Sequence, residues 1–269
     1  MPELDAVRLA PISAPASAPR DLPLAAARVT LFLMVAEARN GGFNLIFDAD
    51  DTLWDSNIHF LEAQGAFVEA LGRAGVFDRA EIHSSIRRHE FTIIEDMGYG
   101  RRPYVMALQR VAAELAPAHH HNSVRSELSR IGDRLLNRRC ELLPGVEPTL
   151  CELARRHRLL LFTKGQPDEQ MRKLERSGLA PLFDRVGIPL EKDAMAYRLL
   201  LAQAQLDPAR TVMVGNSPRS DINPALKAGL RAAVYIPHPH TWELEHEELD
   251  ETDRRVMKIP VFPQLLQVF

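Results

Sequence analysis

Short apolar runs alternate with helically spaced apolar positions along most of this chain. The run from Phe43 to Phe47 follows two glycines and predicts a buried strand at which order begins. Further runs predict strands at 159–163, 184–189, 211–214 and 232–236, with helices around 147–157, 167–177, 194–204 and 221–228. Strands and helices that alternate over short links predict a parallel sheet covered on both faces, an α/β fold.

The stretch from Asn57 to Cys140 has a different pattern. Its apolar residues recur at helical spacing alone, and glycines and prolines separate four such segments. We therefore predict an all-α module inserted into the sheet-forming part of the chain. The expected domains are a tail over 1–40, a core made of 41–56 and 142–269, and a helical module over 57–141.

The first 40 residues differ from both domains. Five prolines lie among alanines and serines before residue 25, which predicts a disordered or extended tail. Translation that starts at Met34 is an alternative, and mass spectrometry of the N-terminus would test it. The apolar run Val29–Ala36 is far shorter than the ~20 residues of a membrane-spanning helix. Acidic residues before this run disfavour a signal peptide, so we expect a cytoplasmic protein.

Composition narrows the expected partners. A net charge of −3 gives no general attraction to nucleic acid or to an anionic membrane, so neither is expected as a partner. Cys140 and Cys151 form no CxxC pair and are expected to be free thiols. The sequence leaves monomer and homodimer equally open.

Three carboxylates directly follow the first predicted strand, in Asp48-Ala49-Asp50-Asp51. Because the carboxyl ends of parallel strands meet at one edge, Asp48, Thr163 and Gly215 are expected to share a rim. Phosphoryl transfer to a side chain needs an anionic nucleophile, a group that moves protons, and positive charge. Two carboxylates beside a phosphate repel it, so a hard cation with oxygen ligands is expected there.

The chain resembles the haloacid dehalogenase-like (HAD) superfamily over about 43–236. Four segments in the family's order carry the resemblance: Phe47-Asp48-Ala49-Asp50-Asp51-Thr52-Leu53, Leu160-Leu161-Phe162-Thr163, Lys192, and Val214-Gly215-Asn216-Ser217 through Asp221. The resemblance implies a Rossmann-like three-layer core with a parallel sheet. It also implies that the helical module is a C1-type cap, a lid that reads the leaving group.

The resemblance implies a role for each matching residue. Asp48 is expected to attack phosphorus and form an aspartyl-phosphate, while Asp50 protonates the leaving oxygen and then activates water. Thr163, with Lys164, Gly165 and nearby backbone amides, is expected to bind the phosphoryl oxygens. Lys192 offsets the charge on Asp48 and phosphate, which makes Asp48, Asp50, Thr163 and Lys192 the expected catalytic residues.

The expected cofactor is Mg²⁺, held by Asp48, the Asp50 carbonyl, Asn216 and Asp221. The family's fourth motif usually has Asp where this chain has Asn216. A neutral amide oxygen is expected to bind Mg²⁺ more weakly than a carboxylate.

Several polar segments have less specific interpretations. Tyr99 and Arg102, with Arg101, lie in a glycine-flanked loop of the helical module and are candidates for substrate contacts, although a solvated turn is the commoner role. His119–His121 is expected to be solvated surface. His238 and His240 are expected to pack structurally, and the acidic run Glu243–Glu251 is expected to be a solvated helix face.

The expected function is Mg²⁺-dependent hydrolysis of a small phosphorylated metabolite, that is, a phosphoric monoester hydrolase. A phosphomutase of the same superfamily and a catalytically inactive phosphate- or metal-binding module are the alternatives. Dehalogenation is disfavoured because halide leaves as an anion and needs no acid at Asp50.

Overall fold

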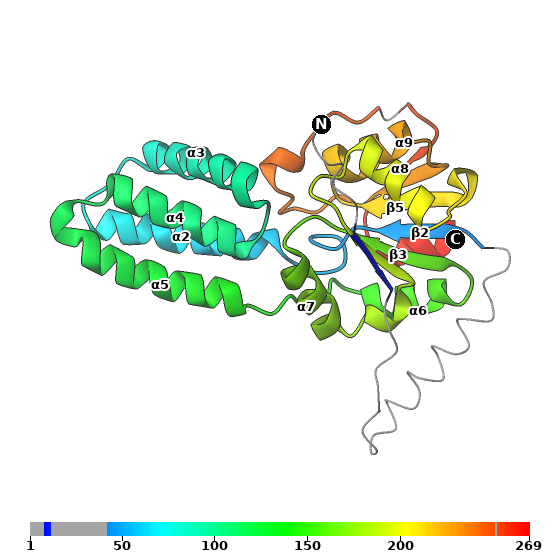
Figure 1. The fold of residues 1–269 in the computed structure, drawn as a ribbon, viewed down its shortest axis with the longest axis horizontal. Coiled ribbons are helices and arrows are strands. Elements are labelled where there is room, and N and C mark those ends of the chain that lie inside the picture. The colour runs from blue at the N-terminus through cyan, green and yellow to red at the C-terminus, as the bar shows by residue number, and fades with distance from the viewer. Residues whose placement is uncertain (1–7, 12–41, 251) are drawn as a thin grey trace, which may run out of the picture. The chain divides into compact units, whose positions relative to one another are not determined.

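The computed structural model describes residues 8–11, 42–250 and 252–269, and it divides into two compact units. The first unit contains the strands (Figure 1), and the second, residues 56–140, contains only helices. Most of the predicted tail, including Met34, lies outside the described residues. Within it, Arg8–Pro11 forms a strand, so the expectation that order begins at Phe43 is wrong.

Strands of the first unit form one sheet in the order β1-β4-β3-β2-β5-β6-β7. Strands β2 to β6 run parallel, as predicted, β7 extends the parallel sheet beside β6, and β1 pairs antiparallel with β4. The two edge strands, β1 and β7, were not predicted, because each is too short to show a pattern. The strands are β1 (Arg8–Pro11), β2 (Asn44–Phe47), β3 (Arg158–Phe162), β4 (Arg185–Ile188), β5 (Thr211–Gly215), β6 (Ala232–Tyr235) and β7 (Val256–Lys258).

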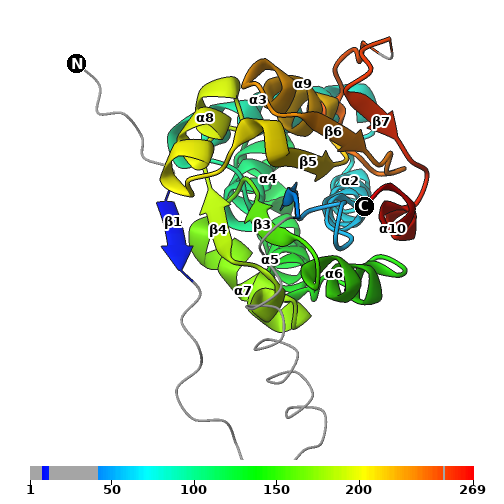
Figure 2. The ribbon, with the colours of Figure 1, turned by 90° about the vertical axis from the view of Figure 1, so that its right-hand side faces the viewer.

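Helices cover both faces of this sheet, as its mainly apolar central strands require. On one face Ile46 and Leu160 pack against Tyr197 of α8 and Leu226 of α9. On the other face the Phe47 ring contacts the rings of Phe183 and Phe262. Figures 1 and 2 show α6 and α7 together on one side of the sheet. The helices are α6 (Val146–Ala154), α7 (Pro167–Ser177), α8 (Ala194–Gln203), α9 (Asn223–Lys227) and α10 (Leu265–Val268).

The order of the strands creates the rim at which ligands bind in such folds. The chain runs from β2 to β3 and β4 on one side, then returns to β5 on the other side of β2. Phe47 is level with Leu161 of β3 and Val214 of β5, so the residues that follow these three strands lie at one edge. The reversal beside β2 is the switch point where α/β sheets bind ligands.

The second unit has its own core. Phe67, Ile86, Leu108 and Leu128 are buried in one cluster, which agrees with the helical spacing in the sequence. Asp78 caps the second of these helices by accepting a hydrogen bond from the Glu81 amide at 3.0 Å. The helices are α2 (Asn57–Arg73), α3 (Arg79–Met97), α4 (Arg101–Leu115) and α5 (His121–Asn137).

One predicted helix is wrong. The acidic run 243–251 was expected to form a solvated helix face, but only Glu243–Glu245 forms a single helical turn, and residue 251 is not described. Glu245 is also largely covered and ion-paired with Lys164. The run is therefore mainly a loop that one acidic side chain fastens to the core.

Candidate functional site

The carboxylate-rich segment after β2 forms a tight turn. The amides of Thr52 and Leu53 both donate to the Ala49 carbonyl, and Asp51 has a left-handed φ of 62°. The turn brings Trp54 back beside Asp50, so the Trp54 Nε1 atom donates to Asp50 Oδ1 at 2.7 Å. Asp48 itself continues the sheet, because its amide donates to the Val214 carbonyl. Asp48 and Asp50 are thereby fixed at the carboxyl edge of β2.

Lys192 joins two carboxylates that are 173 residues apart in sequence. Its Nζ atom lies 2.5 Å from Asp48 Oδ1 and 2.6 Å from Asp221 Oδ1. All three side chains are buried, Asp221 completely. Gly215 makes room for Asp221, because a Cβ atom at Gly215 would meet Asp221 Oδ2 at 2.2 Å. The structure thus brings Asp48, Lys192 and Asp221 together in one buried cluster.

Several oxygen atoms that could bind a hard metal ion lie close to Asp48. The Thr52 hydroxyl lies 3.0 Å from Asp48 Oδ2 and 3.2 Å from Asn216 Oδ1, so these two oxygens approach the same point. Carboxylate and amide oxygens are the ligands that Mg²⁺ prefers. The donor set therefore fits Mg²⁺, with Asp48 and Asn216 best placed as side-chain ligands. Asp221 already accepts hydrogen bonds on both oxygens, from Lys192 and from the Ser217 amide.

The charge in this cluster also fits a cation. Two buried carboxylates share one ammonium group, which leaves one uncompensated negative charge. Burial raises the pKa of Asp48 to about 7, with Asp221 adding to the rise and Lys192 opposing it. Burial alone would lower the pKa of Lys192, yet the two carboxylates raise it above its usual value. A divalent cation would supply the positive charge that the cluster lacks.

Asp50 has a different environment, which was not predicted from the sequence. Besides Trp54, its carboxylate contacts Gln170 Nε2 at 2.9 Å and Lys173 Nζ at 2.9 and 3.0 Å. Burial would raise the pKa of Asp50, but Lys173 and these hydrogen bonds lower it to about 2. The buried positions of α7 are Gln170, Lys173 and Leu174. Because α7 has few apolar residues, its sequence indicates that some polar side chains are buried, but not which ones.

The residues after β3 lie at the same edge. Thr163 is buried, and its amide donates to the Gly187 carbonyl at 3.1 Å. Lys164 pairs with Glu245 at 2.7 Å and with Glu191 at 3.5 Å. Gly165 has a left-handed φ of 129°. Thr163, Lys164 and Gly165 are therefore grouped at the carboxyl end of β3, where their binding role stays a prediction.

Glu245 anchors a loop over the fourth motif. Besides Lys164, it accepts a hydrogen bond from the Ser217 hydroxyl at 2.5 Å. Although burial opposes ionisation, Lys164 and the hydrogen bonds lower the pKa of Glu245 to about 2. In the same loop the Thr241 hydroxyl accepts from Asn216 Nδ2 at 2.9 Å, which orients the Asn216 amide oxygen. The contacts of Glu245 were not predicted, since it was expected on a solvated helix face.

His238 lies between two acidic residues. Asp51, Asp55 and His238 bring one ligand atom each within 4.8 Å of one another. However, the Nδ1 atom of His238 accepts from the His240 amide at 3.3 Å, which leaves the proton on Nε2, 3.2 Å from Asp55 Oδ1. Burial lowers the pKa of His238, in keeping with a neutral ring. We interpret this group as a structural bridge, the role predicted for His238.

The candidate substrate contacts Tyr99 and Arg102 belong to the helical unit. Tyr99 is partly exposed and Arg102 is exposed. Arg101 is buried instead, and its Nη1 atom donates to the Arg138 carbonyl at 2.7 Å while its Nη2 atom lies 3.1 Å from Cys140 Sγ. Arg101 therefore holds α4 against the end of the helical unit, which corrects its interpretation as a substrate-binding residue.

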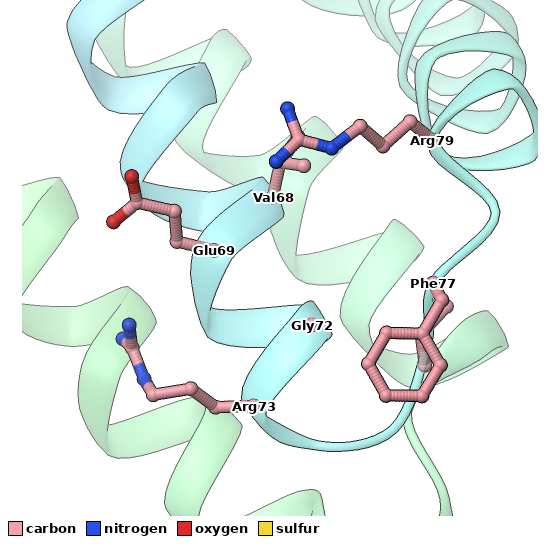
Figure 3. A pocket seen from close by; sticks show the side chains of 7 residues that line it. Val68, Glu69, Gly72, Arg73, Phe77 and Arg79 are labelled. Atoms are coloured by element: carbon pink, nitrogen blue, oxygen red, sulfur yellow. The ribbon is translucent and has the colours of Figure 1, made fainter.

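A hollow of about 370 Å³ lies at the end of α2 in the helical unit (Figure 3). Its lining combines the exposed Phe77 ring with Arg73 and Arg79. None of the predicted site residues lines it, so we assign it no role.

Asn216→Asp tests the metal site. The substitution adds a charged oxygen where a neutral amide now lies, so we expect Mg²⁺ to raise the Tm at a concentration roughly tenfold lower. In EDTA the added charge lies beside Asp48, and we expect a lower Tm than in wild type. Titrating the Tm of both proteins with Mg²⁺ measures this, and an unchanged midpoint would contradict Asn216 as a ligand.

Comparisons with known proteins agree with this geometry. The model of the haloacid dehalogenase-like hydrolases matches residues 44–229. Glyceraldehyde 3-phosphate phosphatase of Methanothermobacter thermautotrophicus is 26% identical over 243 residues, 83% of this chain and 96% of that protein. Phosphoserine phosphatase of Thermus thermophilus is 39% identical over 101 residues, which span only 35% of this chain and 41% of that protein.

Solved structures give the same result. The crystal structure of a haloacid dehalogenase-like hydrolase from Xanthomonas campestris matches with a TM-score of 0.72 and 28% identity, over 84% of this chain and 95% of that one. Within the described parts of this chain, no helix has the length and apolar character needed to cross a membrane. From the family match over most of its length and from the shared fold, the chain belongs to the haloacid dehalogenase-like hydrolases.

Proposed function

We propose that this protein is a Mg²⁺-dependent phosphatase that hydrolyses a small phosphorylated metabolite through an aspartyl-phosphate on Asp48. The proposal rests mainly on one observation: Asp48 and Asp50 lie at the same edge of the sheet, but each carboxylate has a different set of neighbours. Asp48 is buried against Lys192, and Asp50 lies two residues on with its own set of donors. Nucleophile and proton-transfer group are thus separate side chains.

The reaction follows from these positions. Asp48 attacks phosphorus and the bond from phosphorus to the ester oxygen breaks. The protonated form of Asp50, which is a minor form beside Lys173, gives that oxygen its proton. Water then attacks the phosphorus of the aspartyl-phosphate, Asp50 takes the water proton, and inorganic phosphate leaves. Lys192 offsets the charge on Asp48, and Thr163 binds phosphoryl oxygens with Lys164 and the backbone at Gly165. Bound Mg²⁺ would offset further negative charge on the phosphoryl group.

The substrate class is supported by the relatives. Three of them are named as phosphatases of phosphoserine, glyceraldehyde 3-phosphate and N-acylneuraminate 9-phosphate, all small phosphate monoesters. We also propose that the helical unit acts as the cap that selects the leaving group, with Tyr99 and Arg102 as substrate contacts. A cytoplasmic location and a monomeric or homodimeric state remain predictions.

Phosphate release from a panel of monoesters tests the function. The panel contains phosphoserine, glyceraldehyde 3-phosphate, N-acylneuraminate 9-phosphate and p-nitrophenyl phosphate, each with Mg²⁺ or with EDTA. We expect turnover that requires Mg²⁺. A bisphosphate that accumulates during turnover would instead indicate a mutase. Binding of Mg²⁺ with no release from any ester would indicate an inactive binding module.

A further inference from the structure

The carboxylate of Asp50 is held on both oxygens. Oδ1 accepts from Trp54 Nε1 at 2.7 Å and lies 3.0 Å from Lys173 Nζ, while Oδ2 accepts from Gln170 at 2.9 Å and from Lys173 at 2.9 Å. A carboxylate bound on one oxygen can still rotate about its Cβ–Cγ bond. Donors on both oxygens, from two different elements, fix its plane.

The two donors from α7 are built into the core. Gln170 is 3% exposed and Lys173 is 9% exposed, and they lie three residues apart on one face of the helix. Gln170 Nε2 also lies 3.3 Å from Thr163 Oγ1, so one amide group joins Asp50 to the residue expected to bind phosphate. The lack of a side chain at Gly165 leaves room for the Gln170 amide, since a Cβ atom at Gly165 would lie 2.8 Å from Gln170 Nε2.

We propose that Lys173 and Gln170 are positioning residues that aim the Asp50 carboxylate at the leaving-group oxygen of the bound ester. The proposal rests on the proposed function, in which Asp50 transfers the proton. Proton transfer requires the donor oxygen within hydrogen-bond reach of its acceptor, so an Asp50 free to rotate transfers less efficiently. Lys173 also lies 3.4 Å from Glu169, and a purely structural ion pair is the competing explanation.

A comparison of two esters of nearly equal shape separates these explanations. p-Nitrophenolate leaves readily without a proton, whereas phenolate is a poorer leaving group and depends more on the acid. The ratio kcat/KM reports the steps up to release of the alcohol, which include this proton transfer. For Lys173→Met and Gln170→Leu we expect kcat/KM on phenyl phosphate to fall about tenfold or more, because acid catalysis contributes about 10²-fold or more. On p-nitrophenyl phosphate we expect a change within about threefold.

Controls exclude a general loss of structure. Arg172→Met removes a neighbouring positive charge on α7 whose side chain is exposed and pairs with Asp168, so neither ester should be affected. Lys173→Arg keeps a cationic donor and should restore part of the loss on phenyl phosphate. When Asp50 is already replaced by Asn, adding Lys173→Met should change the ratio of the kcat/KM values on the two esters by no more than about twofold.

The outcomes distinguish this inference from the function on which it rests. If Asp50→Asn affects both esters equally, Asp50 is not the acid, and the proposed function fails together with the inference. If Asp50→Asn discriminates between the esters but Lys173→Met and Gln170→Leu lower both equally, only the positioning role is overturned. A wild-type protein that hydrolyses neither ester would overturn both.

Discussion

Replacement of the nucleophile by its isosteric amide, Asp48→Asn, is expected to lower kcat by about 10⁴-fold or more. An amide cannot form the phosphoryl bond, and no other carboxylate takes its place, because Asp50 is held by α7 and Asp221 by Lys192. Phosphate release from p-nitrophenyl phosphate in Mg²⁺ measures the loss. Rapid quenching of the wild-type reaction with ³²P-labelled ester should label the protein, and Asp48→Asn should stay unlabelled.

The folded state of Asp48→Asn should be retained. Burial raises the pKa of Asp48 to about 7, so its ionised form is unfavourable in the folded protein, and the amide should leave the Tm in EDTA equal or higher. Asp207→Asn is a matched control, since Asp207 is exposed and an asparagine there still caps the turn that follows. Asp48→Asn that keeps more than a tenth of wild-type turnover would rule out Asp48 as nucleophile.

Lys192→Met is expected to have the second largest effect, on both activity and stability. It leaves Asp48 and Asp221 buried without their shared cation, which typically costs at least about 3 kcal/mol of unfolding free energy. Urea unfolding in EDTA at pH 8 measures the cost. Lys227→Met is the control, because Lys227 is exposed.

The stability lost in Lys192→Met should depend on pH. Removing the ammonium raises the folded-state pKa of Asp48 and Asp221 further above the unfolded value, so the folded protein binds protons more readily than the unfolded chain. Stability of the variant relative to wild type therefore rises as pH falls, and we expect a smaller deficit at pH 6 than at pH 8. A stability deficit that stays constant between these pH values would contradict the conclusion that Lys192 compensates the charges of both Asp48 and Asp221.

Much of the site was predictable from sequence because its residues follow strands. Asp48, Thr163 and Asn216 come directly after apolar runs, and parallel strands place such positions at one edge whatever the details of packing. Lys192 and Asp221 were predictable only from the resemblance to a family. Spacing alone could not show that their side chains converge within 2.6 Å.

The surroundings of Asp50 show where sequence reasoning failed. Gln170 and Lys173 lie on a helix whose other residues are mostly polar, so periodicity does not separate a buried polar stripe from a solvated one. Glu245 likewise belongs to an acidic run in which Glu243, Glu247 and Glu248 are exposed. The edge strands β1 and β7 have four and three residues, too few for a pattern to be recognised.

By itself the sequence determined the class of fold, the inserted helical module and the position of the carboxylates that follow β2, because apolar periodicity and strand-end positions are local properties of the chain. The tertiary structure decided which charges are compensated. It placed Lys192 between Asp48 and Asp221, Lys173 and Gln170 around Asp50, and Glu245 against Lys164. These contacts join segments distant in sequence, and the burial that sets their strength exists only once the sheet and its helices have assembled.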